Sequence, residues 1–194
     1  MWFARPHRPP VRFGFRDRMR ADAAAVVAGL RTRGLDVVLL SGDRRAAVAA
    51  VAADVGITAW HAACQPADKC RLLREYAQQG RRVLMVGDGL NDAPALAAAH
   101  ASMSPASAVD LSQTAADLVF QGARLEPVIQ SIDVARRATR LIKENFALTF
   151  LYNALTIPLA VAGLVIPLLA AIAMSASSLI VILNALRLAR GGRT

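Results

Sequence analysis

The chain has few cysteines, few aromatic residues and few acidic residues, and each shortage narrows its possible class. Two of the 194 residues are cysteine, Cys64 and Cys70, and their separation matches no zinc-binding spacing. A disulfide framework needs more cysteines, so we interpret both as free thiols. Aromatic residues make up 5%, and no recognition-helix motif or zinc-finger spacing accompanies them. The sequence therefore gives no reason to expect a nucleic-acid partner.

Basic residues outnumber the acidic ones. The 23 lysines and arginines exceed the 14 aspartates and glutamates, which gives a net charge of +9. Many of them flank apolar segments, where they favour the cytoplasmic side of a membrane and anionic lipid headgroups. Residues 1–10 are rich in arginine and proline and lack the apolar core of a secretory signal. We expect residues 1–11 to be a disordered leader.

Long apolar runs are confined to the last quarter of the chain. Hydrophobic residues make up 55% of the sequence, and the excess lies after Phe146. Residues 146–166 and residues 168–186 are each uncharged, and each run is long enough to cross a bilayer core of about 30 Å as a helix. Pro167 alone separates them. They predict a transmembrane helical hairpin over residues 146–187, with a soluble buried hairpin as the alternative.

Basic residues lie on both sides of this hairpin. A cationic amphipathic helix is expected over residues 125–145, and the tail at 188–194 is also basic. The positive-inside rule then places both termini in the cytoplasm. We expect an integral protein of the inner cell membrane with two transmembrane helices, in contact with the lipid bilayer.

Upstream, residues 12–124 alternate between strand-like and helix-like segments. Short apolar runs bounded by glycine or polar residues predict strands, and alanine-rich amphipathic stretches predict helices. We expect strands at residues 11–15, 36–41, 57–60, 83–86, 101–103 and 117–120, and helices at 21–33, 44–55, 67–79 and from 95. This alternation predicts an α/β domain with a partial doubly wound parallel sheet.

The most informative segment runs from Val83 to Leu96. An apolar strand ends in Gly-Asp-Gly, and Asn-Asp follows before a helix begins. Open α/β sheets bind ligands at the carboxyl ends of their strands, and hard oxygen ligands there suit Mg²⁺ beside a phosphate. The candidate residues are Gly87, Asp88, Gly89, Asn91 and Asp92, with Asp88 as the favoured Mg²⁺ ligand. The alternative is a polar turn that binds nothing.

Two further loops carry candidate phosphate-binding residues. Ser41, Gly42 and Asp43 end an earlier strand, where the Ser41 hydroxyl and the loop amides can bind phosphoryl oxygens. Lys69 is expected near a helix start, where its ammonium can neutralise charge on a transferring phosphoryl group. Taken alone, each is more often a structural turn or a surface lysine. Because both occur in this order ahead of the Gly-Asp-Gly segment, a phosphate-binding role is favoured for both.

Polar side chains inside a spanning helix are costly, so their placement is informative. Each apolar segment carries a small polar group on one helical face. The groups are Asn145, Tyr152 and Asn153 in the first segment and Met174, Ser177 and Ser178 in the second. A thioether is a soft ligand that favours Cu(I), and phenol, carboxamide and hydroxyl groups would complete a weak site. The alternatives are serines bonded to their own helix carbonyls, an interfacial tyrosine and a lipid-facing methionine.

The three loops together resemble the phosphorylation domain of P-type ATPases, within the haloacid-dehalogenase-like superfamily. Residues 41–43 match the Thr-Gly-Asp position of that family, and residues 66–69 match its Pro-x-x-Lys. Residues 87–96 match its Gly-Asp-Gly-x-Asn-Asp-x-Pro-Ala-Leu signature. The resemblance implies Mg²⁺, with Asp88 and Asp92 at its site, and ATP as the phosphoryl donor of the complete pump.

The membrane segments resemble the last two helices of heavy-metal P-type ATPases that carry monovalent copper. Tyr152-Asn153 is similar to their Tyr-Asn motif, and residues 174–178 are similar to their Met-x-x-Ser-Ser motif. Residues 101–120 look like the copper pumps associated with assembly of cbb-type haem-copper oxidases. The resemblance implies Cu⁺ as the transported ion, with Tyr152, Asn153, Met174, Ser177 and Ser178 on its path.

The sequence departs from this family in one large respect. The catalytic aspartate of the family lies in Asp-Lys-Thr-Gly-Thr, which does not occur in these 194 residues, and Asp17 instead resembles the family's Asp-x-x-Arg. The resemblance covers residues 12–190, the last quarter or so of such a pump. It implies a C-terminal portion that is inactive as an ATPase alone, either a truncated gene product or half of a split pump whose N-terminal part another chain carries. The alternatives are a membrane-anchored phosphatase of the haloacid-dehalogenase type and a non-catalytic regulator of an intact pump.

The absence of the Asp-Lys-Thr-Gly-Thr segment also removes a strand from the expected sheet. In the family, the strand that carries it lies between the strands that end at Ser41 and at Gly87. Without that strand, its two neighbours either pair directly or leave apolar edges open, and open edges invite aggregation. We therefore expect the soluble half alone to be unstable or to need a partner chain.

Overall fold

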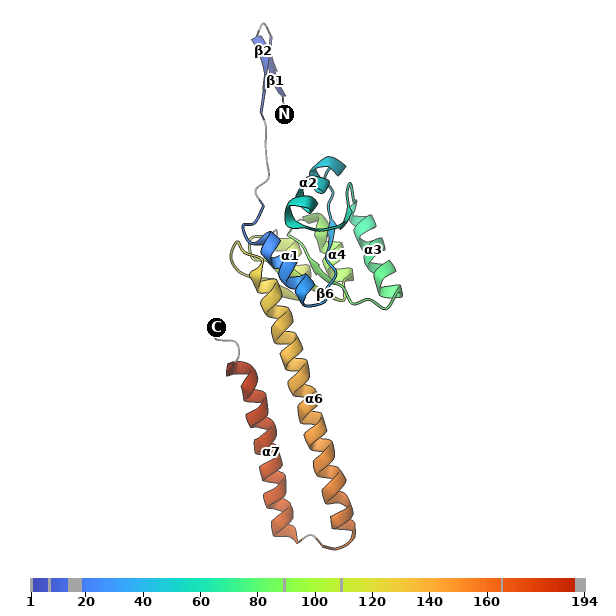
Figure 1. Ribbon diagram of the computed structural model, residues 1–194, viewed down its shortest axis with the longest axis vertical. Helices are drawn as coiled ribbons and strands as arrows, with labels where there is room; N and C mark the ends of the chain where they lie inside the picture. The colour runs from blue at the N-terminus through green and yellow to red at the C-terminus, as the bar shows by residue number, and fades with distance from the viewer. Residues whose placement is uncertain are drawn as a thin grey trace. The chain divides into compact units, whose positions relative to one another are not determined.

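The computed structural model describes residues 2–6, 8–13, 19–88, 90–108, 110–164 and 166–190. The chain forms two compact units, Met1–Pro127 and Val128–Thr194 (Figure 1). The first unit contains all the described strands and the short helices, and the second contains most of two long helices. Residues 1, 7, 14–18, 89, 109, 165 and 191–194 lie outside this description, and they include Asp17, Gly89, the end of the strand expected at 11–15 and the end of the tail.

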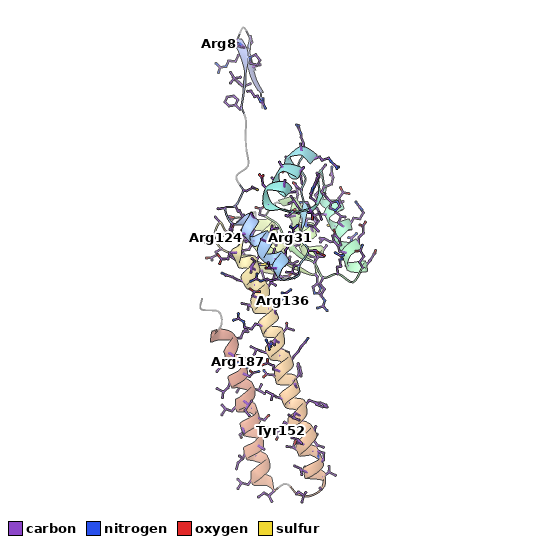
Figure 2. All side chains as sticks on the ribbon, in the orientation of Figure 1. Arg8, Arg31, Arg124, Arg136, Tyr152 and Arg187 are labelled. Carbon is purple, nitrogen blue, oxygen red and sulfur yellow. The ribbon has the colours of Figure 1, made fainter. Side chains whose placement is uncertain are left out.

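The first unit begins with an antiparallel hairpin, where the sequence predicted a disordered leader. Strand β1 (Trp2–Arg5) pairs with β2 (Arg8–Arg12), and Phe3 lies opposite Val11. The Arg5 guanidinium lies 5.3 Å from the centre of the Phe3 ring. All of β2 is exposed, as the outward side chain of Arg8 illustrates (Figure 2). The cross-strand pair favours the hairpin, but two strands without a covered face are only marginally stable in water.

The first parallel sheet contains β3 (Val38–Leu40) and β4 (Ala59–His61), joined by helix α2 (Arg45–Val55). Helix α1 (Ala23–Thr32) precedes them. The buried cluster that joins these helices to the sheet comprises Val27, Ala52, Val55 and Ile57, with Val37, Leu39 and Trp60 packed against it. Gly56 ends α2 at a φ of 78°, a left-handed conformation that glycine adopts readily.

The second parallel sheet contains three strands in the order β5-β6-β7. Its elements, in chain order, are α3 (Pro66–Gln78), β5 (Leu84–Val86), the 3-10 turn η1 (Leu90–Asp92), α4 (Ala93–Ala98), β6 (Ala101–Pro105), α5 (Asp110–Ala115) and β7 (Leu118–Phe120). The buried cluster between α3, α4 and β5 comprises Leu73, Met85, Ala95 and Leu96. The predicted alternation of helices with parallel strands is confirmed.

The predicted single sheet is divided in two. Within the described part of the chain, β3 pairs only with β4, and β5 pairs only with β6. The Ser41 amide donates to the carbonyl of His61 at the end of β4, and the Gly87 amide donates toward β6. Backbone groups alternate in direction along a strand. The amides of Leu40 and Val86 therefore point away from these partners, so β3 and β5 each present an unpaired edge.

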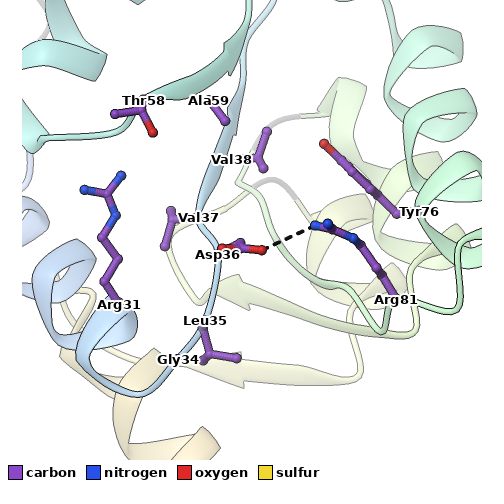
Figure 3. A pocket seen from close by; sticks show the side chains of 10 residues that line it. All are labelled: Arg31, Gly34, Leu35, Asp36, Val37, Val38, Thr58, Ala59, Tyr76 and Arg81. Carbon is purple, nitrogen blue, oxygen red and sulfur yellow. Dashed lines mark hydrogen bonds and ion pairs between the residues drawn. The ribbon is translucent and has the colours of Figure 1, made fainter.

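These two edges lie in the same unit and are linked at their amino ends. Asp36, just before β3, accepts a hydrogen bond of 3.3 Å from Arg81, just before β5 (Figure 3). Two strands that flank one absent strand are about 9.6 Å apart, twice the usual 4.8 Å, and an arginine and an aspartate side chain together can bridge that distance. We call this pair of unpaired edges, on β3 and on β5, the open slot. The structure thus adopts the second predicted outcome, in which the edges stay open.

Helix α6 (Glu126–Val161) is continuous, although the sequence predicted a linking helix at 125–145 and a separate span at 146–166. No glycine or proline interrupts the sequence between residues 128 and 157, so nothing local ends the helix there. Pro158 is accommodated inside its last turn.

Helix α7 (Pro167–Arg190) follows after a short connection and runs beside α6 (Figure 1). Among the described helices, one segment, Ala171–Leu188, is long and apolar enough to cross a membrane, with a mean hydropathy of 1.8. No second segment of this kind is identified among the described residues of α6. The two-helix hairpin is present as helices, while the predicted pair of spans is not established by hydropathy.

Candidate functional site

The loop after β3 contains the predicted residues Ser41, Gly42 and Asp43. The Asp43 amide donates to Ser41 Oγ over 3.1 Å, and that hydroxyl lies 3.3 Å from Asp43 Oδ2. The amides of Ala63 and Cys64 donate to the carbonyls of Asp43 and Ser41, each over 2.9 Å. These bonds fasten the loop to the segment that leads into α3. Gly42 and Asp43 remain exposed at the carboxyl end of the strand.

Lys69 lies in the first turns of α3, where a capping box between Gln65 and Asp68 fixes the helix start. Its side chain is only 10% exposed, and Nζ lies 2.5 Å from Asp92 Oδ1, whose side chain is 14% exposed. Buried charges require a partner of opposite sign. The predicted lysine is therefore at the phosphate loops, but its ammonium is paired with Asp92 rather than open to solvent.

Asp88 follows β5 and carries the open carboxylate of the site. Its side chain is 66% exposed, and Oδ2 lies 3.7 Å from Arg20 Nη2. No cluster of three or more His, Cys, Asp or Glu side chains suited to a metal occurs among the described residues. A single open carboxylate still fits Mg²⁺, since this ion is often held by one or two carboxylates with waters and phosphate oxygens. Asp88 is the residue of this chain that would hold it, whereas Asp92 is engaged by Lys69.

Gly87 is required by the close approach of Asp92. A Cβ at position 87 would lie 2.9 Å from Asp92 Cβ and 3.0 Å from its Oδ2, closer than non-bonded atoms approach. Glycine therefore lets the Asp92 side chain fold back over the end of β5 and reach Lys69. Asn91, the remaining described residue of this loop from the predicted set, is exposed.

These contacts bring the three predicted loops to one edge of the unit. The Ser41 loop is bonded to residues 63–64, these lead into α3, and α3 holds Lys69 against Asp92. A cavity of about 570 Å³, lined in part by Arg31, Tyr76 and Arg81, lies at the opposite, amino ends of β3 and β4 (Figure 3). It is therefore separate from the phosphate loops.

Sequence reasoning missed Arg20 and Asp22. Arg20 was noted only as the end of an Asp-x-x-Arg resemblance, yet it contacts Asp88. Asp22 stands at the N-cap position of α1, which is a common place for aspartate, so its local sequence did not indicate any further role. It is 8% exposed, and the residues that it contacts lie more than 100 positions away. No local pattern could have revealed that contact.

In the second unit, four polar residues join α6 to α7, and we call them the polar clasp: Glu144, Asn145, Asn184 and Arg187. Asn184 Nδ2 donates to Asn145 Oδ1 over 2.9 Å and lies 3.5 Å from Glu144 Oε2. Asn184 Oδ1 accepts from Arg187 Nη1 over 2.8 Å. Both ends of the Asn184 amide are therefore satisfied, Nδ2 by α6 and Oδ1 by Arg187 of α7 itself.

The clasp fixes which residues of the antiparallel helices lie at the same level. Tyr152 is seven residues from Asn145, and Ser177 is seven residues from Asn184, so each lies about 10.5 Å along its helix at 1.5 Å per residue. Both side chains are half-buried (Tyr152 is labelled in Figure 2). These two predicted copper-path residues therefore lie at about the same height along the hairpin, each on a half-buried side of its helix.

The other predicted copper-path residues lie on more open faces. Asn153 and Ser178 are exposed, and Met174 is 68% exposed. Ser178 Oγ donates to the carbonyl of Met174 over 3.1 Å, as the structural alternative for these serines predicted. Within this unit, a set of ligands converging on one point is therefore not formed by these residues alone.

Comparison with known proteins agrees with the fold. Residues 7–100 match the haloacid dehalogenase-like hydrolase family. The chain is 53% identical over 172 residues to nitrogen fixation protein FixI of Bradyrhizobium diazoefficiens, an alignment that covers 89% of this chain and 24% of FixI. It is 41% identical over 177 residues to the probable copper-exporting P-type ATPase V of Mycobacterium tuberculosis, covering 91% of this chain and 23% of that protein.

A solved structure extends the similarity to both units. The crystal structure of a zinc-transporting PIB-type ATPase in the E2.Pi state matches with a TM-score of 0.84 and 32% identity, over 89% of this chain and 28% of that chain. The chain therefore spans about a quarter of the length of the proteins that it matches.

Proposed function

We propose that this chain is a C-terminal portion of a P-type ATPase with a haloacid-dehalogenase-like domain and works as part of an ATP-driven pump for Cu(I). Polypeptide outside these 194 residues carries the rest of the pump, including the phosphorylated aspartate. A relative that is 41% identical is named as a probable copper-exporting ATPase, which supports copper as the cargo.

The observation that carries this proposal is the open slot. The Ser41 loop follows β3 and the Asp88 loop follows β5, and among the described residues each of these strands pairs on one edge only. Unpaired strand edges in a folded protein are usually covered or paired. A strand from outside these residues would pair with both edges and bring its carboxyl end beside Ser41, Lys69 and Asp88.

The chain's own first strands are poor candidates for the slot. β2 contains Pro9 and Pro10, which have no amide to donate to a ladder. The hairpin also carries Arg5, Arg8 and Arg12, which do not suit the position between apolar clusters that a central strand occupies. A separate apolar strand fits better.

At the phosphate edge, each residue then has a distinct role. The Ser41 hydroxyl and the neighbouring loop amides bind phosphoryl oxygens. Lys69 is held in place by Asp92 and neutralises charge on the transferring group. Asp88 holds Mg²⁺, which supplies further charge neutralisation when bound. None of these groups is the nucleophile, so this chain alone is expected to form no phosphoenzyme.

In the membrane, we propose that α6 and α7 both span the bilayer, with the chain termini in the cytoplasm. The basic residues before and after the apolar parts support this orientation. Tyr152 and Ser177 lie at one level, and the open faces of Asn153, Met174 and Ser178 are left for helices of the remaining pump. Those helices would complete a Cu(I) path that this hairpin supplies in part.

The test is to restore a complete pump from two chains. This chain is coexpressed with the first three quarters of the Bradyrhizobium FixI, and the membranes are incubated with Mg²⁺ and radiolabelled ATP. We expect an acid-stable, hydroxylamine-sensitive phosphoprotein on the FixI portion only when both chains are present. Asp88→Ala in this chain is expected to lower the label to background.

The control is Asp54→Asn, which changes an exposed carboxylate on α2 and should leave the label unchanged. Label on this chain when it is expressed alone would overturn the proposal, because it would show a nucleophile within these residues. Absence of label in the mixture, while intact FixI is labelled, would also count against it. Cu(I) uptake by the same vesicles then tests the cargo.

A further inference from the structure

A buried carboxylate outside the phosphate loops joins two distant parts of the first unit. Asp22 Oδ2 accepts hydrogen bonds from the backbone amides of Leu125, over 2.7 Å, and Glu126, over 2.9 Å. These are the residues at the start of α6. Asp22 stands directly before α1, but its side chain makes no capping bond to that helix. Its carboxylate caps the start of α6 instead.

The chemistry of a helix start explains why a carboxylate is suited to this position. The first amides of a helix have no partner within the helix, and the positive end of the helix dipole favours an anion there. Pro127 has no amide to satisfy, and the amides of Leu125 and Glu126 find their acceptor in Asp22, outside the helix. Arg124 Nε lies 3.7 Å from the same Asp22 oxygen and balances its charge.

The same short segment reaches the phosphate loops at its other end. Arg20 is separated from Asp22 by Ala21 alone, and its Nη2 lies 3.7 Å from Asp88 Oδ2. In the described structure, Arg20 Nη1 and Asp22 Oδ1 are buried without a hydrogen-bond partner. Unsatisfied buried polar atoms are rare in stable, fixed arrangements. Residues 20–22 therefore contact both Asp88 and the start of α6, and at each end one polar atom still lacks a hydrogen bond.

We propose that residues 20–22 form a strap that couples the loop of Asp88 to the start of α6, with Asp22 as the positioning residue. A change at Asp88 that weakens its contact with Arg20 moves the strap, and Asp22 passes that movement to the two amides of α6. The inference rests on the proposed function only for what binds at Asp88. The contacts themselves are independent of copper, ATP and any second chain.

Amide hydrogen exchange of the full chain in phospholipid nanodiscs tests the strap directly. The peptide 121–127 is informative because Pro127 contributes no amide. We expect Asp22→Ala to speed exchange at Leu125 and Glu126 by about tenfold or more, the effect of losing a charge-assisted hydrogen bond. Asp22→Asn keeps an acceptor oxygen and should restore most of the protection.

The coupling itself is tested by a variant that touches neither amide. Asp88→Asn removes only the exposed carboxylate that Arg20 contacts, and we expect exchange at Leu125 and Glu126 to rise about twofold, as for a partly exposed ion pair. Asp54→Asn is the matched control and should change nothing there.

Two results would overturn the proposal. Unchanged exchange at these amides in Asp22→Ala would show that Asp22 does not hold the start of α6, and Asp22→Leu, which has similar volume but no acceptor, decides the point if the alanine variant does not fold. Unchanged exchange in Asp88→Asn would show that the strap carries no coupling. Neither measurement uses ATP, Mg²⁺ or a partner chain, so failure here is distinct from failure of the pump proposal.

Discussion

The two units of this chain are incomplete in opposite ways. The first unit buries its side chains well, including the Lys69–Asp92 pair, but leaves backbone groups unpaired along β3 and β5. The second unit satisfies its backbone within two helices but leaves large apolar side chains uncovered, such as Phe150 at 77% and Val161 at 84% exposed. The first therefore lacks a hydrogen-bonding strand, and the second lacks an apolar environment.

This difference indicates what completes each unit. Lipid or further apolar helices can cover the side chains of α6 and α7, because dispersion and hydrophobic contacts need no fixed partner. An open strand edge is more demanding, since a strand must approach in register to pair with it. We therefore expect the loss of a polar contact to lower the free energy of unfolding more in the first unit than in the second.

The largest effect is expected when the first unit is expressed without most of the second. Residues 12–144 expressed without the rest of α6 and α7 are expected to aggregate or to unfold without cooperativity, because the edges of β3 and β5 remain open. Size-exclusion chromatography and thermal unfolding measure this. A monodisperse protein with a sharp transition would contradict the prediction.

Within the first unit, Lys69→Ala should have a large effect. It removes the ammonium that pairs with the Asp92 carboxylate, and loss of one member of a buried pair costs about 3–5 kcal/mol. Denaturant unfolding of the full chain in detergent, followed by Trp60 fluorescence in a Trp2→Phe background, gives the free energy of unfolding.

The matched control for this pair is the double variant Lys69→Met with Asp92→Asn, which removes both charges at similar volume. It should be more stable than Lys69→Ala. If the double variant is less stable, the cost would reflect lost packing around α3 rather than an unpaired charge.

Two buried serines on β6 sharpen the comparison further. Ser102 Oγ donates to Asp117 Oδ2 over 2.9 Å and accepts from the Asp117 amide over 3.1 Å, whereas Ser104 Oγ has no partner in the described structure. Ser102→Ala should lower the free energy of unfolding by about 1–3 kcal/mol, since it leaves buried groups unpaired. Ser104→Ala should be neutral or stabilising. Equal losses in both variants would contradict this assignment.

In the second unit, Asn184→Leu should cost only about 0.6 kcal/mol, typical of a hydrogen bond between membrane helices. Its effect should instead appear in the register of α6 against α7. Cross-linking of Tyr152→Cys with Ser177→Cys, in a Cys64→Ser/Cys70→Ser background, should be efficient and should fall when Asn184 is replaced.

The offset pair Tyr152→Cys with Val181→Cys is the control for that register. It should cross-link poorly with Asn184 present. Equal yields for the two pairs would mean that the polar clasp does not set the level of the helices.

Local pattern predicted the elements of this chain better than their assembly. The apolar run before Gly87 and the glycine stop at Gly56 predicted β5 and the end of α2, because both signals lie within a few residues. The sequence predicted parallel strands but left open whether β3 and β5 pair directly, because strand order depends on what lies between them. The leader was predicted as disordered but contains the β1–β2 hairpin.

For the candidate site, too, local features were predicted and contacts between distant residues were not. The loops of Ser41, Lys69 and Asp88 were found from residue type and spacing. The pairing of Lys69 with Asp92 and the capping of α6 by Asp22 could not be found that way, because each joins residues distant in sequence.

Amide exchange along β3 and β5 tests the open slot most directly. In the full chain alone, the amides of Val38, Leu40, Leu84 and Val86 should exchange much faster than those of Leu39 and Met85, which point toward β4 and β6. Addition of the FixI portion should then protect the fast set. Equal protection of both sets in the chain alone would mean that β3 and β5 pair directly, and the slot would not exist.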